Sequence, residues 1–228
     1  MSRRRRRGER ALRVLISAGP TREPIDSVRF LSNYSTGMMG ACLATEALSR
    51  GHQVTVVCGP VTEPYPRGVR LIPVERSTEM ARAMRQQARQ ADAVVMAAAV
   101  ADFRPAQRQK TKLARHGRLT LHLRATPDII KSLPRRPGQV VAGFALESVR
   151  VVQRARRKLQ LKRLDLLLAQ QAGTAQPPFG QRTVRAWLLE RPGRVTDLGR
   201  TSKSSVARAL LDKIEALWYG QPRSQHLC

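Results

Sequence analysis

The sequence predicts an α/β protein in which a mostly parallel sheet is covered by helices on both faces. Short, almost continuously apolar segments alternate with longer segments whose apolar residues recur at helical spacing. Strands that are apolar along their whole length are typical of a parallel sheet buried on both sides. The 228 residues suit one Rossmann-like domain, expected over 12–218, between a basic disordered tail at 1–11 and a loose tail at 219–228.

The first half of the chain contains four predicted strands and two predicted helices. The strands are the apolar segments 12–19, 52–60, 69–75 and 92–103. The first helix follows Thr36 and stops at Gly51, a residue type that often ends helices. The second helix covers 77–91 and opens with Ser77 and Glu79, whose side chains can cap a helix start.

The second half begins with a basic segment, 104–118, that lacks periodicity and is expected to form a mobile flap. A strand at 119–126 and a short helix at 127–134, begun by Pro127, follow it. The remaining expected elements are a strand at 139–148, a helix at 149–162, a strand at 164–171, a hairpin at 183–199 and a helix at 202–218. The hairpin is expected to belong to a dimerisation region.

Charge dominates the composition, because 42 Lys and Arg residues stand against 16 Asp and Glu residues, a net charge of +26. Such a field attracts polyanions. The arginines occur in every segment, however, and aromatic residues, on which bases would stack, make up 4% of the chain. We therefore expect the main partner to be a small anionic ligand and not nucleic acid.

The cysteines and the apolar segments indicate a reduced, cytoplasmic protein. Cys42, Cys58 and Cys228 are odd in number and share no metal-ligand spacing. The longest apolar runs are too short to cross a bilayer, and no signal-peptide pattern is present. We expect no membrane partner.

An unusual feature is the distance between the first strand and the first glycine-rich turn, "SNYSTGMMG" at 32–40. Dinucleotide-binding folds turn directly from strand to glycine loop, whereas here 21–31 intervene. Ligands of open parallel sheets bind at the carboxyl ends of the strands. The segments expected there are 19–40, 96–112, 143–147 and 169–173. Helix N-termini at Thr36 and Pro127 would direct N–H groups at a phosphate.

Several polar residues near these strand ends have both a functional and a structural interpretation. Asp102 either contacts a ligand or caps a turn. Lys110 either follows a moving phosphate or belongs to a solvated loop. Lys158 and Lys162, four residues apart, either bind phosphate together or form a solvated helix face. Asn33 either binds a ligand or turns the chain.

An alternative function is that of an NAD(P)-dependent reductase. The glycines near the first helix and the end of the second predicted strand provide evidence about this alternative. Gly37 and Gly40 either approach a phosphate or only allow helix and strand to pack closely. A reductase would need G-x-G-x-x-G directly after the first strand and an acidic residue at the end of the second. The second strand ends "VVCGP", without a carboxylate, which argues against this alternative.

Long motifs in a fixed order extend these observations. The stretches "VLISAGPTREPIDSVRFLSNYSTGMMG" and "AAAVADFRP" closely resemble the phosphopantothenoylcysteine synthetase family. The resemblance continues through "TPDII", "GFALES", "RKLQLKRLDLLLA" and "TSKSSVA" and covers about 12 to 215. In many bacteria this synthetase is fused behind a flavin-dependent decarboxylase. Only a basic tail precedes Leu12, so we expect a free-standing synthetase without flavin.

The resemblance implies a ligase reaction in two steps. The carboxylate of 4'-phosphopantothenate attacks the α-phosphate of a nucleotide to give an acyl-nucleotidylate and pyrophosphate. The amine of L-cysteine then attacks the acyl carbon and releases the nucleoside monophosphate. Members of the bacterial type use CTP with Mg²⁺, and eukaryotic relatives can use ATP. Relatives pair as dimers whose subunits complete each other's sites, so a homodimer is expected.

The resemblance also implies roles for individual residues. Asn33, which would bind the reacting acyl group, and Lys110, on the flap over the nucleotide, are the expected catalytic residues. The expected nucleotide-binding residues are Met96, Asp102, Lys110, Thr126, Pro127, Asp128, Ile129, Phe144, Lys158 and Lys162. The expected substrate-binding residues are Gly19, Arg22, Arg29, Asn33, Gly37 and Lys203. Either Arg22 or Arg29 would meet the pantothenate phosphate, and no metal ligands are assigned.

The sequence departs from the family pattern on the nucleotide side of the expected site. Thr126 replaces the usual Asn of an Asn-Pro-Asp turn, and "AQQAG" at 169–173 stands where relatives carry Ala-Asn-Asp. The flap is about two residues shorter before Lys110. A second alternative function therefore stays open, a catalytically degenerate synthetase whose basic surface binds nucleic acid.

Overall fold

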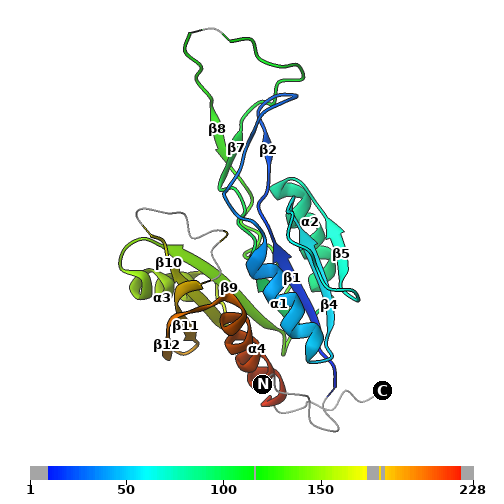
Figure 1. Ribbon diagram of the computed structural model, residues 1–228, viewed down its shortest axis with the longest axis vertical. Helices are drawn as coiled ribbons and strands as arrows, with labels where there is room; N and C mark the ends of the chain where they lie inside the picture. Colours follow the sequence, from blue (N-terminus) through cyan, green and yellow to red (C-terminus); the bar gives the residue numbers. More distant parts are fainter. Residues whose placement is uncertain (1–9, 116, 174–179, 181–182, 222–228) are drawn as a thin grey trace.

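The computed structural model describes residues 10–115, 117–173, 180 and 183–221, which contain a sheet of eight strands (Figure 1). The strand order is β12-β11-β10-β9-β6-β1-β4-β5. Neighbours from β5 to β10 are parallel, whereas β11 and β12 add an antiparallel hairpin at one edge. The strands are β1 (Arg13–Ala18), β4 (Gln53–Cys58), β5 (Arg70–Pro73), β6 (Ala93–Met96), β9 (Val140–Glu147), β10 (Leu166–Gln171), β11 (Thr183–Glu190) and β12 (Val195–Ser202). The predicted mostly parallel sheet is confirmed.

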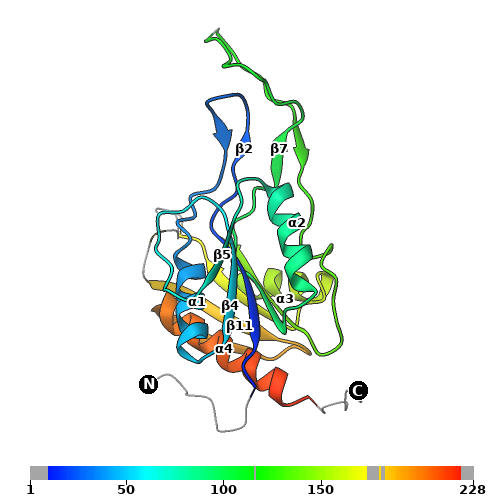
Figure 2. The same ribbon diagram turned by 90° about the vertical axis from the view of Figure 1, so that its right-hand side faces the viewer.

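Helices cover both faces of the sheet, as predicted (Figure 2). They are α1 (Met38–Ser49) and α4 (Lys203–Tyr219) on one face, and α2 (Ser77–Ala88) and α3 (Val151–Leu161) on the other. Side chains of a strand point alternately to its two faces. Val14 and Ile16 of β1 therefore pack with α1 and α4, whereas Leu15 packs on the side of α2 and α3. Burial on both sides explains why these strands are apolar throughout.

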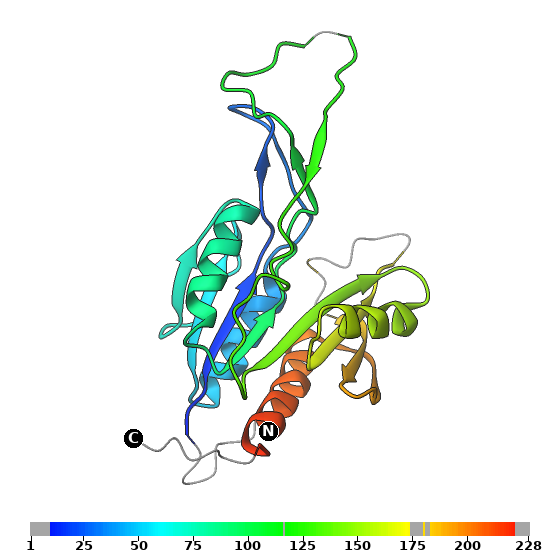
Figure 3. The same cartoon turned by 180° about the vertical axis from the view of Figure 1, so that it is seen from behind.

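Two extended arms project beyond the carboxyl end of the sheet (Figures 1 and 3). The first arm, 21–31, contains β2 (Glu23–Pro24) and β3 (Phe30–Leu31), and the second arm, 103–125, contains β7 (Phe103–Pro105) and β8 (Leu123–Ala125). The arms are hydrogen-bonded to each other. The Gln109 N–H donates to the Ile25 carbonyl at 2.9 Å, and the Leu113 N–H donates to Asp26 Oδ2 at 3.1 Å. The long segment before the glycine-rich turn is thus the first arm, and the basic flap belongs to the second.

The chain between β6 and β9 differs from the sequence-based expectation. The predicted strand at 92–103 stays in the sheet only over Ala93–Met96, because the chain then leaves the sheet for the second arm. The predicted helix at 127–134 is wrong: 129–132 form a turn, in which the Ser132 N–H donates to the Asp128 carbonyl at 3.2 Å. Prolines at both ends leave too few residues for a stable helix, and burial of Ile129 fixes the turn. Pro127 therefore presents no helix N-terminus to a phosphate.

Both ends of the described chain lie at the amino end of the sheet (Figure 1). Tyr219, expected in a loose tail, ends α4, and its hydroxyl donates to the Arg10 carbonyl at 2.8 Å. Arg10 also forms an ion pair with Asp92 at 3.2 Å. Within the expected tails, residues 1–9 and 222–228 lie outside the described residues. None of the helices in the described part of the chain is long and apolar enough to cross a membrane.

Candidate ligand-binding site

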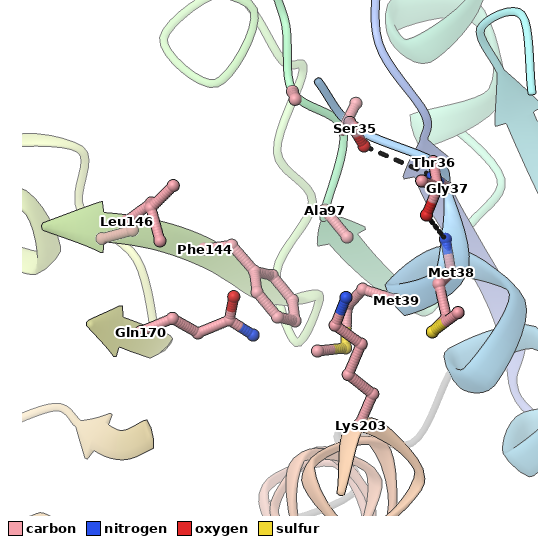
Figure 4. Close-up of a pocket in the computed structure, with 13 residues that line it drawn as sticks. Ser35, Thr36, Gly37, Met38, Met39, Ala97, Phe144, Leu146, Gln170 and Lys203 are labelled. Carbon is pink, nitrogen blue, oxygen red and sulfur yellow. Dashed lines mark hydrogen bonds between the residues drawn. The ribbon is translucent and has the colours of Figure 1, made fainter. Parts of the chain in front are cut away.

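A pocket of about 170 Å³ lies at the carboxyl ends of β6, β9 and β10, on the face covered by α1 and α4 (Figure 4). It is lined by the start of α1, the segment after β6, two strand ends and the first residue of α4. The lining residues are Ser35, Thr36, Gly37, Met38, Met39, Ala97, Ala98, Ala99, Phe144, Ala145, Leu146, Gln170 and Lys203. Three of the residues expected from the sequence, Gly37, Phe144 and Lys203, thus line one pocket.

The start of α1 has the features of an anion site. Gly37 is the N-cap residue, so no side chain caps the helix there, and the first turn contains no acidic residue. The hydroxyl groups of Ser35 and Thr36 accept only long hydrogen bonds, of 3.4 Å, from the N–H groups of Gly37 and Met38. N–H groups at a helix start, together with the positive end of the helix dipole, favour a phosphate group.

Glycines allow the chain to approach closely around this helix start. A Cβ atom on Gly37, whose φ is 85°, would lie 2.7 Å from Val61 Cγ1. A Cβ atom on Gly19, whose φ is 74°, would lie 2.6 Å from the same atom. A Cβ atom on Gly40 would lie 2.3 Å from the Cβ atom of Ala18 in β1. Gly37 thus lines the pocket, whereas Gly40 lets α1 pack on β1.

Asn33 lies beside the pocket, on the segment that leads into α1. Its Nδ2 donates to the carbonyl of Ala99, a pocket-lining residue, at 2.8 Å. Next to it, the Ser32 hydroxyl donates to the Thr21 carbonyl at 2.9 Å, and the Ala101 N–H donates to Thr21 Oγ1 at 3.0 Å. These bonds hold the segment against the chain that follows β6 and leave Asn33 exposed to solvent.

Lys203 contributes an ammonium group to the pocket from the first residue of α4 (Figure 4). The residue is only 5% exposed. Burial lowers the pKa of Lys203, whereas Cys42 and Glu63 act in the opposite direction. No carboxylate of the described residues forms an ion pair with it. A buried cation without a partner favours the binding of an anion.

Lys158 lies in the last turn of α3 and Lys162 is the C-cap residue of this helix, and both contact carboxylates. Lys158 Nζ lies 2.6 Å from Glu147 Oε1, and Arg154 Nη1 lies 3.3 Å from Oε2 of the same group. Lys162 Nζ lies 3.5 Å from Asp128 Oδ1. Neither lysine lines the pocket in this structure.

Of the other expected nucleotide-binding residues, Met96 ends β6, Lys110 lies on the second arm, and the rest flank that arm in the sequence. Met96 is 7% exposed and lies behind the pocket wall, where the Ser17 hydroxyl donates to its sulfur at 3.8 Å. The Thr126 hydroxyl donates to the Ala101 carbonyl at 2.6 Å and so ties the second arm to the segment after β6. The exposed members of the set are Asp102, Lys110, Pro127 and Asp128.

Arg22 and Arg29, the two candidates for binding a substrate phosphate, have different surroundings on the first arm. Arg29 contacts the Asp26 carboxylate through Nε at 2.9 Å and Nη2 at 2.5 Å. The guanidinium holds the pKa of Asp26 far below its usual range. Arg22 lies over the ring of Phe30, 4.7 Å from its centroid, and forms no ion pair with any described residue. Of the two guanidinium groups, only that of Arg22 therefore lacks a carboxylate partner among the described residues.

The sequence analysis did not assign part of the pocket wall. Met39, Leu146 and Gln170 line the cavity, but Gln170 was noted only as part of a departure from the family pattern. Gln170 pairs with Leu146 where the parallel strands β10 and β9 end side by side. Both residues lie in segments that the strand-end rule selects, 143–147 and 169–173, but neither received a role of its own.

The structure belongs to the Rossmann-like class of α/β proteins. It has a mostly parallel sheet with helices on both faces, a glycine at the start of α1 and a pocket at the strand ends. Known proteins narrow this class. The chain belongs to the family described as the DNA/pantothenate metabolism flavoprotein C-terminal domain, which matches residues 10–217.

Individual relatives agree with this assignment and with the resemblance found in the motifs. The chain is 38% identical over 207 residues to the coenzyme A biosynthesis bifunctional protein CoaBC of Bacillus subtilis (strain 168), covering 90% of this chain and 51% of that protein. It is 38% identical over 209 residues to a cysteine/cysteine sulfinic acid decarboxylase of an unknown prokaryotic organism, covering 90% and 58%. The chain thus spans about half the length of these relatives. The crystal structure of the CoaBC C-terminal domain superposes with a TM-score of 0.78 and 33% identity, covering 92% of this chain and 97% of that chain.

Proposed function

We propose that this protein is a ligase of coenzyme A biosynthesis that joins 4'-phosphopantothenate to L-cysteine. The observation that supports this most directly is the match to the CoaBC C-terminal domain over nearly the whole of both chains. The longer relatives include one named as a decarboxylase. The match to a separate C-terminal domain favours the ligase, because the family resemblance places ligation in that part of the bifunctional protein.

The proposed chemistry joins anions, so the protein must supply cations and N–H donors. First, a carboxylate oxygen of 4'-phosphopantothenate attacks the α-phosphorus of the nucleotide, and the bond to pyrophosphate breaks. The cysteine nitrogen then attacks the acyl carbon, loses a proton and displaces the nucleoside monophosphate. Donors already in place at the start of α1 stabilise the charge that develops on phosphate oxygens.

We place the triphosphate between the start of α1 and Lys203, with the nucleoside extending toward Phe144. Lys110 closes over it from the second arm, and Lys158 and Lys162 exchange their carboxylate partners for phosphate oxygens. CTP is the expected nucleotide, with ATP as the alternative. No group of three or more His, Cys, Asp or Glu side chains in the described residues is arranged to hold a metal ion. Mg²⁺ is therefore taken to enter as part of the nucleotide, which supplies phosphate oxygens as ligands.

We place 4'-phosphopantothenate between the first arm and Asn33. Arg22 is the better candidate for its phosphate, because the guanidinium of Arg29 is bound to Asp26. Asn33, whose amide is neutral and lies beside Ala99, then contacts the reacting acyl group without adding charge.

We place the homodimer contact on the arms and not on the predicted C-terminal hairpin, whose strands β11 and β12 belong to the sheet. The arms carry exposed apolar side chains that one subunit leaves uncovered: Val28, Phe30, Phe103, Leu119 and Leu123. Apolar groups gathered on projecting segments are typical of subunit contacts.

Pyrophosphate release tests the proposed function. The full chain is mixed with Mg²⁺ and 4'-phosphopantothenate, with CTP or ATP, and with or without L-cysteine. We expect release that depends on 4'-phosphopantothenate and an amide product only when cysteine is present. Folded protein that releases no pyrophosphate with either nucleotide would contradict the ligase, and a fall in RNA binding with rising salt would then support the nucleic-acid alternative.

A further inference from the structure

The side chain of Gln170 lines the pocket with an unused hydrogen-bond donor. Its Nε2 is buried and has no hydrogen-bond partner in the part of the chain that the structure describes. In Figure 4 the amide points toward the ring of Phe144. A buried N–H group without an acceptor destabilises the folded protein. Methionine would fill a similar volume without this penalty, so packing alone does not account for a glutamine here.

The position of Gln170 in β10 determines the face of the sheet from which its side chain projects. It lies on the same side as Leu166 and Leu168, which pack with α1 and α4. Gln171, the next residue, points to the opposite side and is exposed. Gln171 therefore carries the same side chain outside the pocket and is a matched control for Gln170.

The two ends of the pocket differ in chemistry (Figure 4). One end has the helix start at Thr36 and Gly37 and suits phosphate oxygens. The other end has the aromatic ring of Phe144 and the neutral amide of Gln170. A ring for stacking and an amide for an edge contact are the groups that bind a planar base.

We propose that Gln170 recognises the base of the bound nucleotide, by donating from Nε2 to a carbonyl oxygen or ring nitrogen of that base. The proposal rests on the proposed function only in requiring that this pocket binds a nucleotide. Bases differ in the acceptors along their edges, so a fixed donor discriminates among them.

The test measures binding without catalysis, using CTP, UTP, ATP and inorganic tripolyphosphate as probes of the full-length protein. Gln170→Met removes the donor at similar volume, and Gln170→Glu replaces it with a carboxylate oxygen. Gln171→Met and Gln171→Glu are the controls. In the Gln170→Met protein we expect the preferred nucleotide to bind about tenfold more weakly, the loss that one hydrogen bond represents. Tripolyphosphate should bind as before, and the melting temperature without ligand should rise.

Each other result would overturn the proposal. Unchanged nucleotide affinity would remove Gln170 from recognition, and an equal loss for tripolyphosphate would assign it to the phosphates. A lower melting temperature without ligand would indicate a structural role. If the unmodified protein binds nucleotide and Gln170→Met behaves as expected, but no pyrophosphate is released, the ligase fails and the base contact stands. If the unmodified protein binds no nucleotide at all, both proposals fail.

Discussion

At the scale of single residues, a buried group of charges joins α1 to α4. His52 Nδ1 accepts from the Leu12 N–H at 3.3 Å, and its Nε2 lies 2.9 Å from Glu215 Oε1. Arg50 Nη1 lies 3.0 Å from Glu215 Oε2 and also contacts Asp212 at 2.8 Å. Burial alone would raise the pKa of Glu215, but the hydrogen bond from His52 and the charge of Arg50 lower it below its ordinary value.

This lowered pKa predicts how stability depends on pH. A carboxyl group with a lower pKa in the folded state stabilises the fold above its unfolded pKa, and the stabilisation is lost as the pH falls through the folded value. The loss for Glu215 therefore begins near the ordinary value of 4.5 and continues below it. We expect Glu215→Gln to lower the free energy of unfolding at pH 7 by about 1–3 kcal/mol.

Urea denaturation of both proteins, followed by circular dichroism at several pH values, checks this expectation. The difference between the two proteins should shrink as the pH falls below 4.5, the ordinary pKa of the group. A difference that stays constant over that range would show that the Glu215 charge does not stabilise the fold.

A second prediction at this scale concerns Asn33→Asp. The new carboxylate would lie beside an anionic acyl-nucleotidylate, so the second step should slow by about 10²-fold. Pyrophosphate should still be released when 4'-phosphopantothenate and nucleotide are supplied. Parallel assays of pyrophosphate and amide product separate the two steps, and normal amide formation in the variant would exclude this role for Asn33.

The sequence indicated which types of residue lie near the site, but it did not reveal the ion-pair and hydrogen-bond partners of these residues. The spacing of Lys158 and Lys162 correctly indicated a helix at this point, although α3 ends at Leu161 and Lys162 is its C-cap residue. Their carboxylates, Glu147 and Asp128, come from other parts of the chain, and no periodicity reveals such pairs. The unpaired amide of Gln170 is likewise visible only when β9, β10 and their neighbours are assembled.

At the scale of elements, α1 and α3 end in the same hydrogen-bond pattern with different residues. After α1, the Gly51 N–H donates to the Leu48 carbonyl at 2.8 Å, and the next N–H donates one residue further back. After α3, the Arg163 N–H donates to the Gln160 carbonyl at 3.0 Å, and the following N–H again donates further back. Both Gly51 and Arg163 have positive φ, 77° and 50°. Only glycine adopts this conformation without steric cost.

The difference between these helix ends predicts opposite effects of two substitutions. Arg163→Gly should raise the free energy of unfolding by about 0.5–1 kcal/mol, because it removes the steric cost of positive φ. Gly51→Ala should lower it by a similar amount, about 1 kcal/mol. Urea midpoints of the two variants provide the measurement. Equal shifts in the same direction would contradict this account.

Elements buried in the sheet were easier to predict from the sequence than segments that leave it. Strands buried on both faces, such as β4 and β9, were predicted because burial dictates continuous apolar residues. The strand at 92–103 was predicted too long and the helix at 127–134 was wrong, because the local pattern does not show where the chain leaves the sheet. The arms escaped prediction for a related reason: bonds such as that between Gln109 and Ile25 join segments more than 80 residues apart.

At the scale of the whole molecule, the apolar arms contrast with a chain whose net charge is +26. Such a charge opposes random association between copies. A dimer therefore needs a specific apolar contact, and we propose that the exposed side chains of the arms form it.

Two matched substitutions test this dimer contact. Leu123 on β8 is 46% exposed, and Leu71 on β5 is 47% exposed. We expect Leu123→Glu to weaken the homodimer by about tenfold or more, because a charge in an apolar contact must lose its water. Leu71→Glu should leave it unchanged. Sedimentation equilibrium measures both, and an equal effect of the two variants would show that the arms are not the contact.

The hydrogen bond from Tyr219 to Arg10 has a consequence for the order of the elements along the chain. The bond holds the two ends of the described chain together at the amino end of the sheet, and the pocket lies at the carboxyl end (Figure 1). A short linker between these ends would permit circular permutation, with new termini opened at the exposed turn around Gly193. The pocket depends on which strand ends lie side by side, and that arrangement is independent of where the polypeptide begins.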